Sequence, residues 1–135
     1  MAHPDYRMKR ILRLRKGVKC KMKVYLAKNM MNLPMYGNVP ALTQNNESVD
    51  SFEITEDESD FIDALFIDQT NELCNAALDL GDYQYYNTSQ CALLLEWINK
   101  MKDEDCMIPL QRFLNSLESY LQYAVANNTG IAIEL

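Results

Sequence analysis

Apolar side chains recur at spacings of three and four residues along the second half of the chain, which is the pattern of helices that bury one face. Three such helices are predicted, and each has recognisable ends. The first begins at Thr55, whose side chain forms a reciprocal capping box with that of Glu58, and Gly81 is placed to end it. The predicted core stripe of this helix consists of Ile62, Leu65, Phe66, Leu73, Ala76, Ala77 and Leu80.

The second predicted helix begins at Asn87, where Gln90 completes a similar box, and its apolar arc covers more than half of the circumference. Such a helix is covered on more than one side. The third helix begins with Pro109 at the first helical position, and residues 127–130 end it. The core-facing positions are Cys91, Leu94, Leu95, Ile98 and Met101 in the second helix and Leu110, Phe113, Leu114, Leu117, Leu121, Ala124 and Val125 in the third.

Strands are predicted on both sides of this helical region. Residues 22–27 combine β-branched and aromatic side chains, and residues 131–135 form an apolar terminal strand. Residues 52–54 are a candidate for a short strand, whereas residues 29–50 have the turn and loop chemistry of proline, glycine and polar side chains. We expect the first and last strands to pair, because the backbone groups of the last strand need a neighbour. The order predicts an α+β fold, in which an N-terminal strand, an irregular loop, three helices and a C-terminal strand form a small sheet.

Charge divides the chain into two parts. Residues 1–23 hold nine of the 13 basic side chains and one acid, whereas residues 24–135 hold four basic side chains and 18 acids. The two parts therefore carry formal charges of +8 and −14, which sum to the −6 of the whole chain. We interpret residues 1–21 as a basic leader, either flexible or an upstream extension of a chain that starts at Met22. Residues 22–135 are interpreted as a single acidic α+β domain.

The composition argues against several classes of protein. No apolar run approaches the ~20 residues needed to cross a bilayer, and no apolar segment follows the basic leader as it would in a secretory signal. The four cysteines are scattered and form no C-x-x-C pair, which favours a reduced protein over a disulfide framework. We therefore expect a cytoplasmic protein that does not bind a membrane.

The sequence carries no catalytic or metal-binding signature. The one histidine, His3, lies in the leader, so no Ser-His-Asp or Cys-His arrangement can be assembled. Cys74, Cys91 and Cys106 lack the short-range spacing of a zinc site, and the acids at 103–105 lack the alternating ligands of a calcium loop. With four glycines in the chain, no phosphate-binding loop is present. We predict a protein that is not an enzyme and that binds no metal and no cofactor.

The far side of the first predicted helix is one candidate binding surface. At about 100° per residue, Glu56, Asp60, Asp63 and Ile67 share a stripe opposite the core face. Two interpretations are open. Either the apolar part of this stripe packs under the loop at 29–50, or it is an apolar anchor ringed by acids that binds a partner.

The segment between the first and second helices is the other candidate surface, and it contains Asp82, Tyr83, Tyr85 and Tyr86. Tyrosine is rigid and amphipathic, and it is enriched at interface hot spots. Alternatively, one or two of these rings cap the core and keep their hydroxyls in water. In an extended segment, Tyr83 and Tyr85 point to one side and Tyr86 points to the other.

Two stretches of the acidic body carry a resemblance to a known class of protein. Residues 77–97, ALDLGDYQYYNTSQCALLLEW, and residues 127–135, NNTGIAIEL, resemble small acidic bacterial immunity proteins of polymorphic or contact-dependent toxin systems. The resemblance covers residues 22–135 and leaves the leader out. It implies a protein-binding inhibitor that neutralises a cognate toxin domain. Toxin domains that are nucleases are typically basic, and a basic partner fits the acidic body of this chain. No binding residue follows from the resemblance.

Two other functions remain open. The acidic body also fits a different interaction module, such as a phage-encoded inhibitor that imitates nucleic acid. The basic leader fits a nucleic-acid-binding regulator whose affinity falls steeply with salt. Against this, its single aromatic residue, Tyr6, offers no stacking platform, and the acidic body would repel nucleic acid. The favoured partner is therefore a protein, a basic toxin domain.

Overall fold

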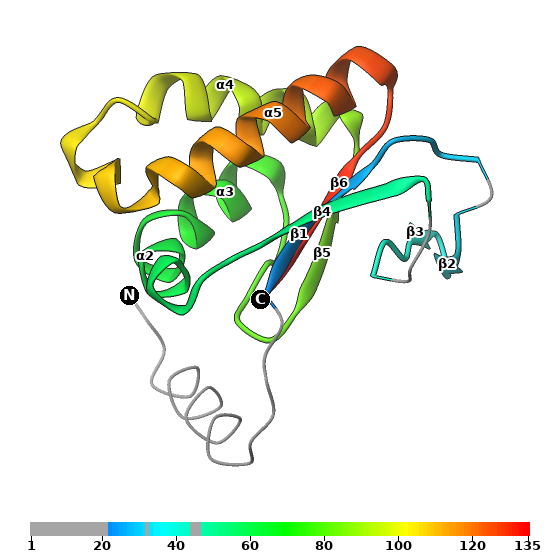
Figure 1. Ribbon diagram of the computed structural model, residues 1–135, viewed down its shortest axis with the longest axis horizontal. Helices are drawn as coiled ribbons and strands as arrows, with labels where there is room; N and C mark the ends of the chain where they lie inside the picture. The colour runs from blue at the N-terminus through cyan, green and yellow to red at the C-terminus, as the bar shows by residue number, and fades with distance from the viewer. Residues whose placement is uncertain (1–21, 32, 44–46) are drawn as a thin grey trace.

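The computed structural model describes residues 22–31, 33–43 and 47–135. In these residues, α-helices cover one face of a small antiparallel sheet (Figure 1), which confirms the predicted α+β class. The sheet has the strand order β4-β1-β6-β5. Its strands are β1 (Lys23–Ala27), β4 (Val49–Glu53), β5 (Tyr83–Tyr86) and β6 (Ile131–Glu134). The predicted basic leader, residues 1–21, lies outside the described residues.

The first and last strands lie side by side at the centre of the sheet, as predicted. β1 pairs with β6 so that Lys23 lies opposite Glu134, and with β4 so that Lys23 lies opposite Glu53. Because side chains alternate along a strand, Val24 and Leu26 enter the core beneath the helices. Of the short strand predicted at 52–54, Phe52 and Glu53 belong to the longer β4, which ends before Ile54.

The helices are α2 (Glu56–Leu65), α3 (Ile67–Cys74), α4 (Thr88–Met101) and α5 (Gln111–Asn127), with the short 3-10 helix η1 (Asp105–Leu110) before α5. Both predicted capping boxes are confirmed. The Glu58 N–H donates to Thr55 Oγ1 (3.1 Å), and the Thr55 N–H donates to Glu58 Oε1 (3.0 Å). The box of Asn87 and Gln90 at the start of α4 has the same two hydrogen bonds. None of the helices described here is long and apolar enough to cross a membrane.

The first predicted helix is in fact two helices. It breaks at Phe66, which ends α2 and precedes α3, and the helical path stops at Asn75 rather than at Gly81. Asn75 adopts a left-handed conformation with φ 51°, and the side chain of Asn71 bonds both the N–H and the carbonyl of Leu78 (2.8 Å each). These bonds hold Leu78 in place after the helical path has ended. The predicted core stripe is consequently wrong at Leu73 and Ala77, which are exposed.

The start of the third predicted helix also differs from the prediction. Pro109 lies inside η1, and α5 begins two residues later at Gln111. A proline lacks the N–H that a continuing helix would use, so the tighter turn of η1 precedes the regular helix. The predicted end is confirmed, since Asn128 caps α5 in a left-handed conformation with φ 55°.

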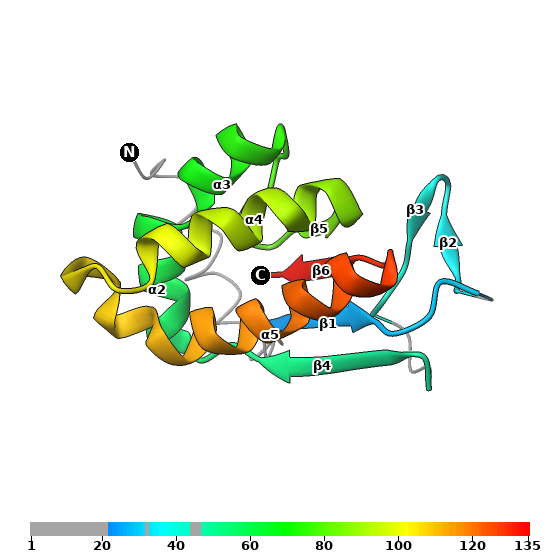
Figure 2. The ribbon, with the colours of Figure 1, turned by 90° about the horizontal axis from the view of Figure 1, so that it is seen from above.

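Aromatic rings join the helices into one core above the sheet. The ring of Phe66 meets those of Trp97 and Phe113 edge-on, with centroid distances of 5.6 and 5.4 Å. Figure 2 shows α4 and α5 lying alongside each other over the sheet. The second face of the sheet carries a smaller cluster of buried side chains, formed by Tyr25, Ala27, Leu33, Leu42 and Ala132.

The second cluster is covered by the segment that the sequence predicts as an irregular loop. Two very short strands, β2 (Met35–Tyr36) and β3 (Val39–Pro40), pair within it. We call residues 28–43 the methionine arm, of which residue 32 is outside the described part. Figure 1 shows the arm leaving the end of β1 and lying away from the helices.

Candidate functional site

The far stripe of the first helix does not form the predicted surface. Ile67 is 5 % exposed and belongs to the core beneath the helices, together with Cys74 and Leu78. The interpretation of Ile67 as an exposed anchor is therefore wrong. The alternative is right that this patch is buried, but the loop at 29–50 does not cover it, because the arm packs on the opposite face of the sheet. The break at Phe66 separates the stripe into two helices.

The exposed face of α2 nevertheless combines acids with one apolar ring. Asp57, Asp60, Phe61 and Ala64 are exposed at the spacing i, i+3, i+4 and i+7 that defines one side of a helix. Phe61 is 41 % exposed and takes the place that the sequence assigns to Ile67. Two of the other predicted residues, Glu56 and Asp60, are exposed, and Asp63 is half-buried.

The tyrosine segment is an edge strand of the sheet, β5, rather than a connection between helices. As predicted for an extended segment, its rings alternate. Tyr86 is fully buried in the core beneath the helices, so its assignment to a binding surface is wrong. Tyr83 and Tyr85 lie on the opposite face with the smaller cluster, and Asp82 is exposed just before the strand.

The methionine arm is a surface that the sequence interpretation missed. Ten large apolar side chains of the described residues are well exposed, and half of them lie within ten positions of the arm. They are Met30, Met31, Met35, Tyr36 and Val39, which are between 40 and 70 % exposed. The arm has no acidic residue and a single basic one, Lys28. The available signal was three methionines within six residues, which turn chemistry does not require.

Tyr83 anchors the methionine arm to the sheet. Its hydroxyl donates to the carbonyl of Pro40 (2.6 Å) and accepts from the N–H of Leu42 (3.0 Å). Burial raises the pKa of Tyr83, which keeps the hydroxyl in the protonated form that the bond to Pro40 requires. Tyr85 contacts the part of the arm that precedes β2, where its hydroxyl lies 3.8 Å from the sulfur of Met30. Tyr83 and Tyr85, which the sequence suggested as binding residues, therefore contact the methionine arm and hold it against the sheet.

Acidic groups lie beside the anchored arm on the same face of the sheet. The Tyr25 hydroxyl donates to Glu134 Oε1 (2.9 Å), and burial, followed by this carboxylate, raises the pKa of Tyr25. In the strand register, Lys23 lies between Glu53 and Glu134. The arm, in which Lys28 is the one charged side chain, thus lies on the same face of the sheet as Glu53, Lys23 and Glu134.

Metal-ligating side chains and thiols are present in the described part of the chain. No three histidine, cysteine, aspartate or glutamate side chains come together there to hold a metal ion. Burial raises the pKa of Cys74 to about 11 and that of Cys91 to about 12, so both thiols are protonated at neutral pH. What the described surface offers is apolar and acidic contact area.

Comparison with protein-family models, curated proteins and solved structures found no match to this chain. The resemblance to immunity proteins therefore remains a prediction.

Proposed function

We propose that this protein is a binding inhibitor of the immunity type, which neutralises a basic toxin domain by covering part of its surface. The observation that carries the proposal is the methionine arm. Methionine and tyrosine are enriched in the buried centres of protein interfaces, and charged residues are depleted there. The arm has this composition, and Tyr83 holds it in place through two hydrogen bonds.

Charge supports a basic partner. Residues 24–135 carry a formal charge of −14, whereas the arm within them carries only Lys28. An acidic body attracts a basic protein over a distance and raises the rate of association. The exposed apolar side chains of the arm then supply contacts that do not require charges to be stripped of water. The two properties together favour a protein partner of opposite charge.

The proposal predicts that the gene immediately upstream encodes a toxin domain, and this domain is the partner for the test. Co-expression with that domain should restore growth, and calorimetry should show a one-to-one complex. The triple variant Met31→Ser, Met35→Ser, Tyr36→Ser should weaken binding by about 100-fold or more, since it removes several contacts of an interface centre. Ile108→Ser is the matched control, because Ile108 in η1 is 63 % exposed, the same fraction as Tyr36.

Two outcomes would contradict different parts of the proposal. A triple variant that binds as tightly as the parent protein would show that the arm is not the contact surface. A parent protein that neither binds nor neutralises the neighbouring toxin domain would refute the immunity function.

A further inference from the structure

β4 and β5 are the two edge strands of the sheet, and a side chain bonds one backbone carbonyl on each of them. At the β5 edge, the side chain of Gln84 donates to the carbonyl of Tyr85 (2.9 Å) and accepts from the N–H of Ala77 (3.3 Å). At the β4 edge, no described element lies beyond the strand, and Figure 2 shows β4 at the margin of the sheet. Among the described residues, β4 is therefore an edge strand with no neighbouring strand on its outer side.

The register shows which groups of β4 point outward. In antiparallel strands, residues alternate between pairs that exchange hydrogen bonds and pairs that do not. The Lys28 N–H donates to the Ser48 carbonyl (2.7 Å), and the Ile54 N–H donates to the Met22 carbonyl (2.9 Å). Even-numbered residues of β4 consequently bond to β1. The outward groups belong to Val49, Ser51 and Glu53.

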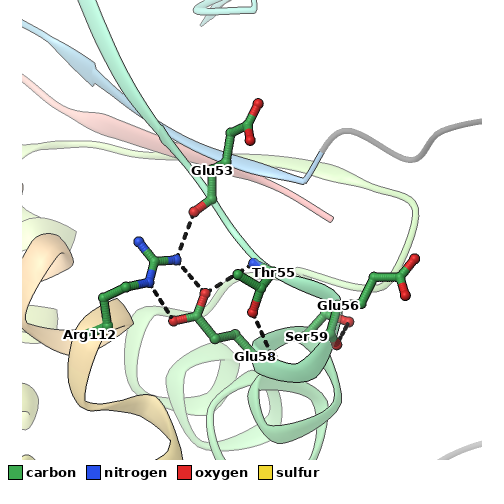
Figure 3. A network of polar contacts seen from close by, with 6 residues as sticks. All are labelled: Glu53, Thr55, Glu56, Glu58, Ser59 and Arg112. Carbon is green, nitrogen blue, oxygen red and sulfur yellow. Dashed lines mark hydrogen bonds and ion pairs between the residues drawn. The ribbon is translucent and has the colours of Figure 1, made fainter.

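At one end of β4, a side chain already forms a hydrogen bond with an outward-facing backbone group. Arg112 donates from Nη2 to the carbonyl of Glu53 (2.9 Å), as Figure 3 shows. This bond confirms that the carbonyl of Glu53 faces outward, and it marks where the open edge ends. On its outward side β4 also presents the N–H groups of Val49, Ser51 and Glu53 and the carbonyl groups of Val49 and Ser51.

We infer that β4 accepts an extended basic segment of a partner protein as an added strand of the sheet. Proteins usually protect an open edge with charged side chains, proline or a bulge; β4 contains no lysine or proline, and its two charged side chains, Asp50 and Glu53, are both acidic, so they disfavour an acidic strand and favour a basic one. Its backbone groups supply the hydrogen bonds of strand addition. The inference rests on the proposed function, because it specifies how a basic partner is held.

The acidic side chains on and next to β4 indicate which kind of segment pairs with this strand. Glu47, Asp50 and Glu53 lie on or next to the strand within seven positions. A second copy of this chain would bring the same three acids to the contact, and like charges on neighbouring strands are unfavourable. A segment with lysine or arginine at alternate positions brings the opposite charge and the same backbone pattern.

Hydrogen exchange tests the inference on the unmodified protein, with a ten-residue peptide of alternating lysine and valine as the probe. The amides of Val49, Ser51 and Glu53 should exchange at least about tenfold more slowly when the peptide is bound. The amides of Asp50 and Phe52 face β1 and serve as internal controls, since their protection should not change. Binding without protection at the outward amides would show charge attraction alone and overturn the inference, as would no binding at about 1 mM peptide.

Variants separate this inference from the proposed function. Ser51→Pro removes one outward N–H and leaves the bonds to β1 intact, so peptide binding should fall at least about tenfold while the melting temperature stays near that of the parent. Ser51→Thr should bind the peptide as the parent does. If Ser51→Pro neutralises and binds the toxin domain as well as the parent, the added strand is refuted and the inhibitor function stands.

The free protein provides one further check. Protection of Val49 and Ser51 that rises with protein concentration in the absence of peptide would show a second copy on the edge, and would also overturn the inference.

Discussion

Arg112 in α5 and Glu58 in α2 form a bidentate ion pair. Arg112 Nε lies 3.0 Å from Glu58 Oε2, and Arg112 Nη2 donates to Glu58 Oε1. The same carboxylate accepts the N–H of Thr55, so one side chain completes the helix cap and the link to α5 (Figure 3). Arg112 also bonds the carbonyl of Glu53. The pair therefore fixes the end of β4, the start of α2 and the start of α5 relative to one another.

Glu58→Gln should destabilise the domain by about 1–2 kcal/mol at pH 7, because it removes a charge-assisted pair whose arginine is half exposed. Burial favours the neutral acid, but the hydrogen bonds from Arg112 and Thr55 outweigh it and hold the pKa of Glu58 below its usual range. The carboxylate of Glu58 thus binds a proton less readily in the folded state than in the unfolded state, where the pKa of a glutamate is about 4.3. The stabilisation is fully present above that pH, and it disappears as the pH falls through the lower pKa that Glu58 has in the folded state.

Urea unfolding of the parent and Glu58→Gln at pH 7 and at pH 3 measures this difference. The gap in free energy of unfolding should narrow at the lower pH. An equal gap at both values would mean that the charge of Glu58 contributes nothing to stability.

Ile67→Arg should lower the free energy of unfolding by roughly 3–4 kcal/mol, because it places a charge in the apolar core. Phe61→Arg is the matched variant on the exposed face of α2 and should change stability by less than about 0.5 kcal/mol. Denaturant midpoints of the two variants give the comparison. Equal midpoints would be incompatible with the burial of Ile67.

Tyr83→Phe should loosen the methionine arm. It leaves the N–H of Leu42, a fully buried residue, without its acceptor, at a cost of about 1–3 kcal/mol. Protease cleavage within residues 33–43 should become faster, whereas Tyr36→Phe should leave it unchanged. Unaltered cleavage in Tyr83→Phe would show that other contacts hold the arm.

Gly130→Ala should destabilise the end of the sheet by about 1–3 kcal/mol. An added Cβ would lie 2.5 Å from the carbonyl oxygen of Tyr86 and would also collide with the ring of Tyr85. Thermal melts of the variant measure the cost. The double variant with Tyr85→Ala should recover only part of it, because the backbone of Tyr86 remains in the way.

Removal of residues 1–21 should leave the melting temperature of the domain unchanged. The predicted core stripes and strands of the sequence all lie at or beyond Met22. Melts of the full and shortened proteins provide the comparison. A shortened protein that fails to unfold cooperatively would place part of the fold before Met22.

Local sequence signals predicted much of this fold. The capping boxes at Thr55 and Asn87 fixed two helix starts correctly, because both partners of each box lie three residues apart. The break at Phe66 was not predictable in this way, since apolar spacing continues through it. It depends on long-range packing, and the end at Asn75 depends on a side-chain bond from Asn71 to Leu78 seven positions away.

The candidate site was harder to predict than the fold. Ile67 and Tyr86 have the composition of interface residues, but whether such side chains face solvent depends on how distant elements pack over them. The methionine arm was missed for the opposite reason. Its turn residues indicate a loop, and only the hydrogen bonds of Tyr83 across more than 40 positions show that this loop is held on the sheet.

The central position of β6 has a consequence for the kinetics of folding. β6 lies between β1 and β5, and its pairing joins Lys23 to Glu134, 111 positions apart. The helices and the β1–β4 pair can form from segments closer in sequence, whereas closing this long loop is entropically slow. Until β6 docks, β1 and β5 each present an unpaired edge. Refolding should therefore be rate-limited by the arrival of one strand, and the transient species should be the one most prone to aggregate.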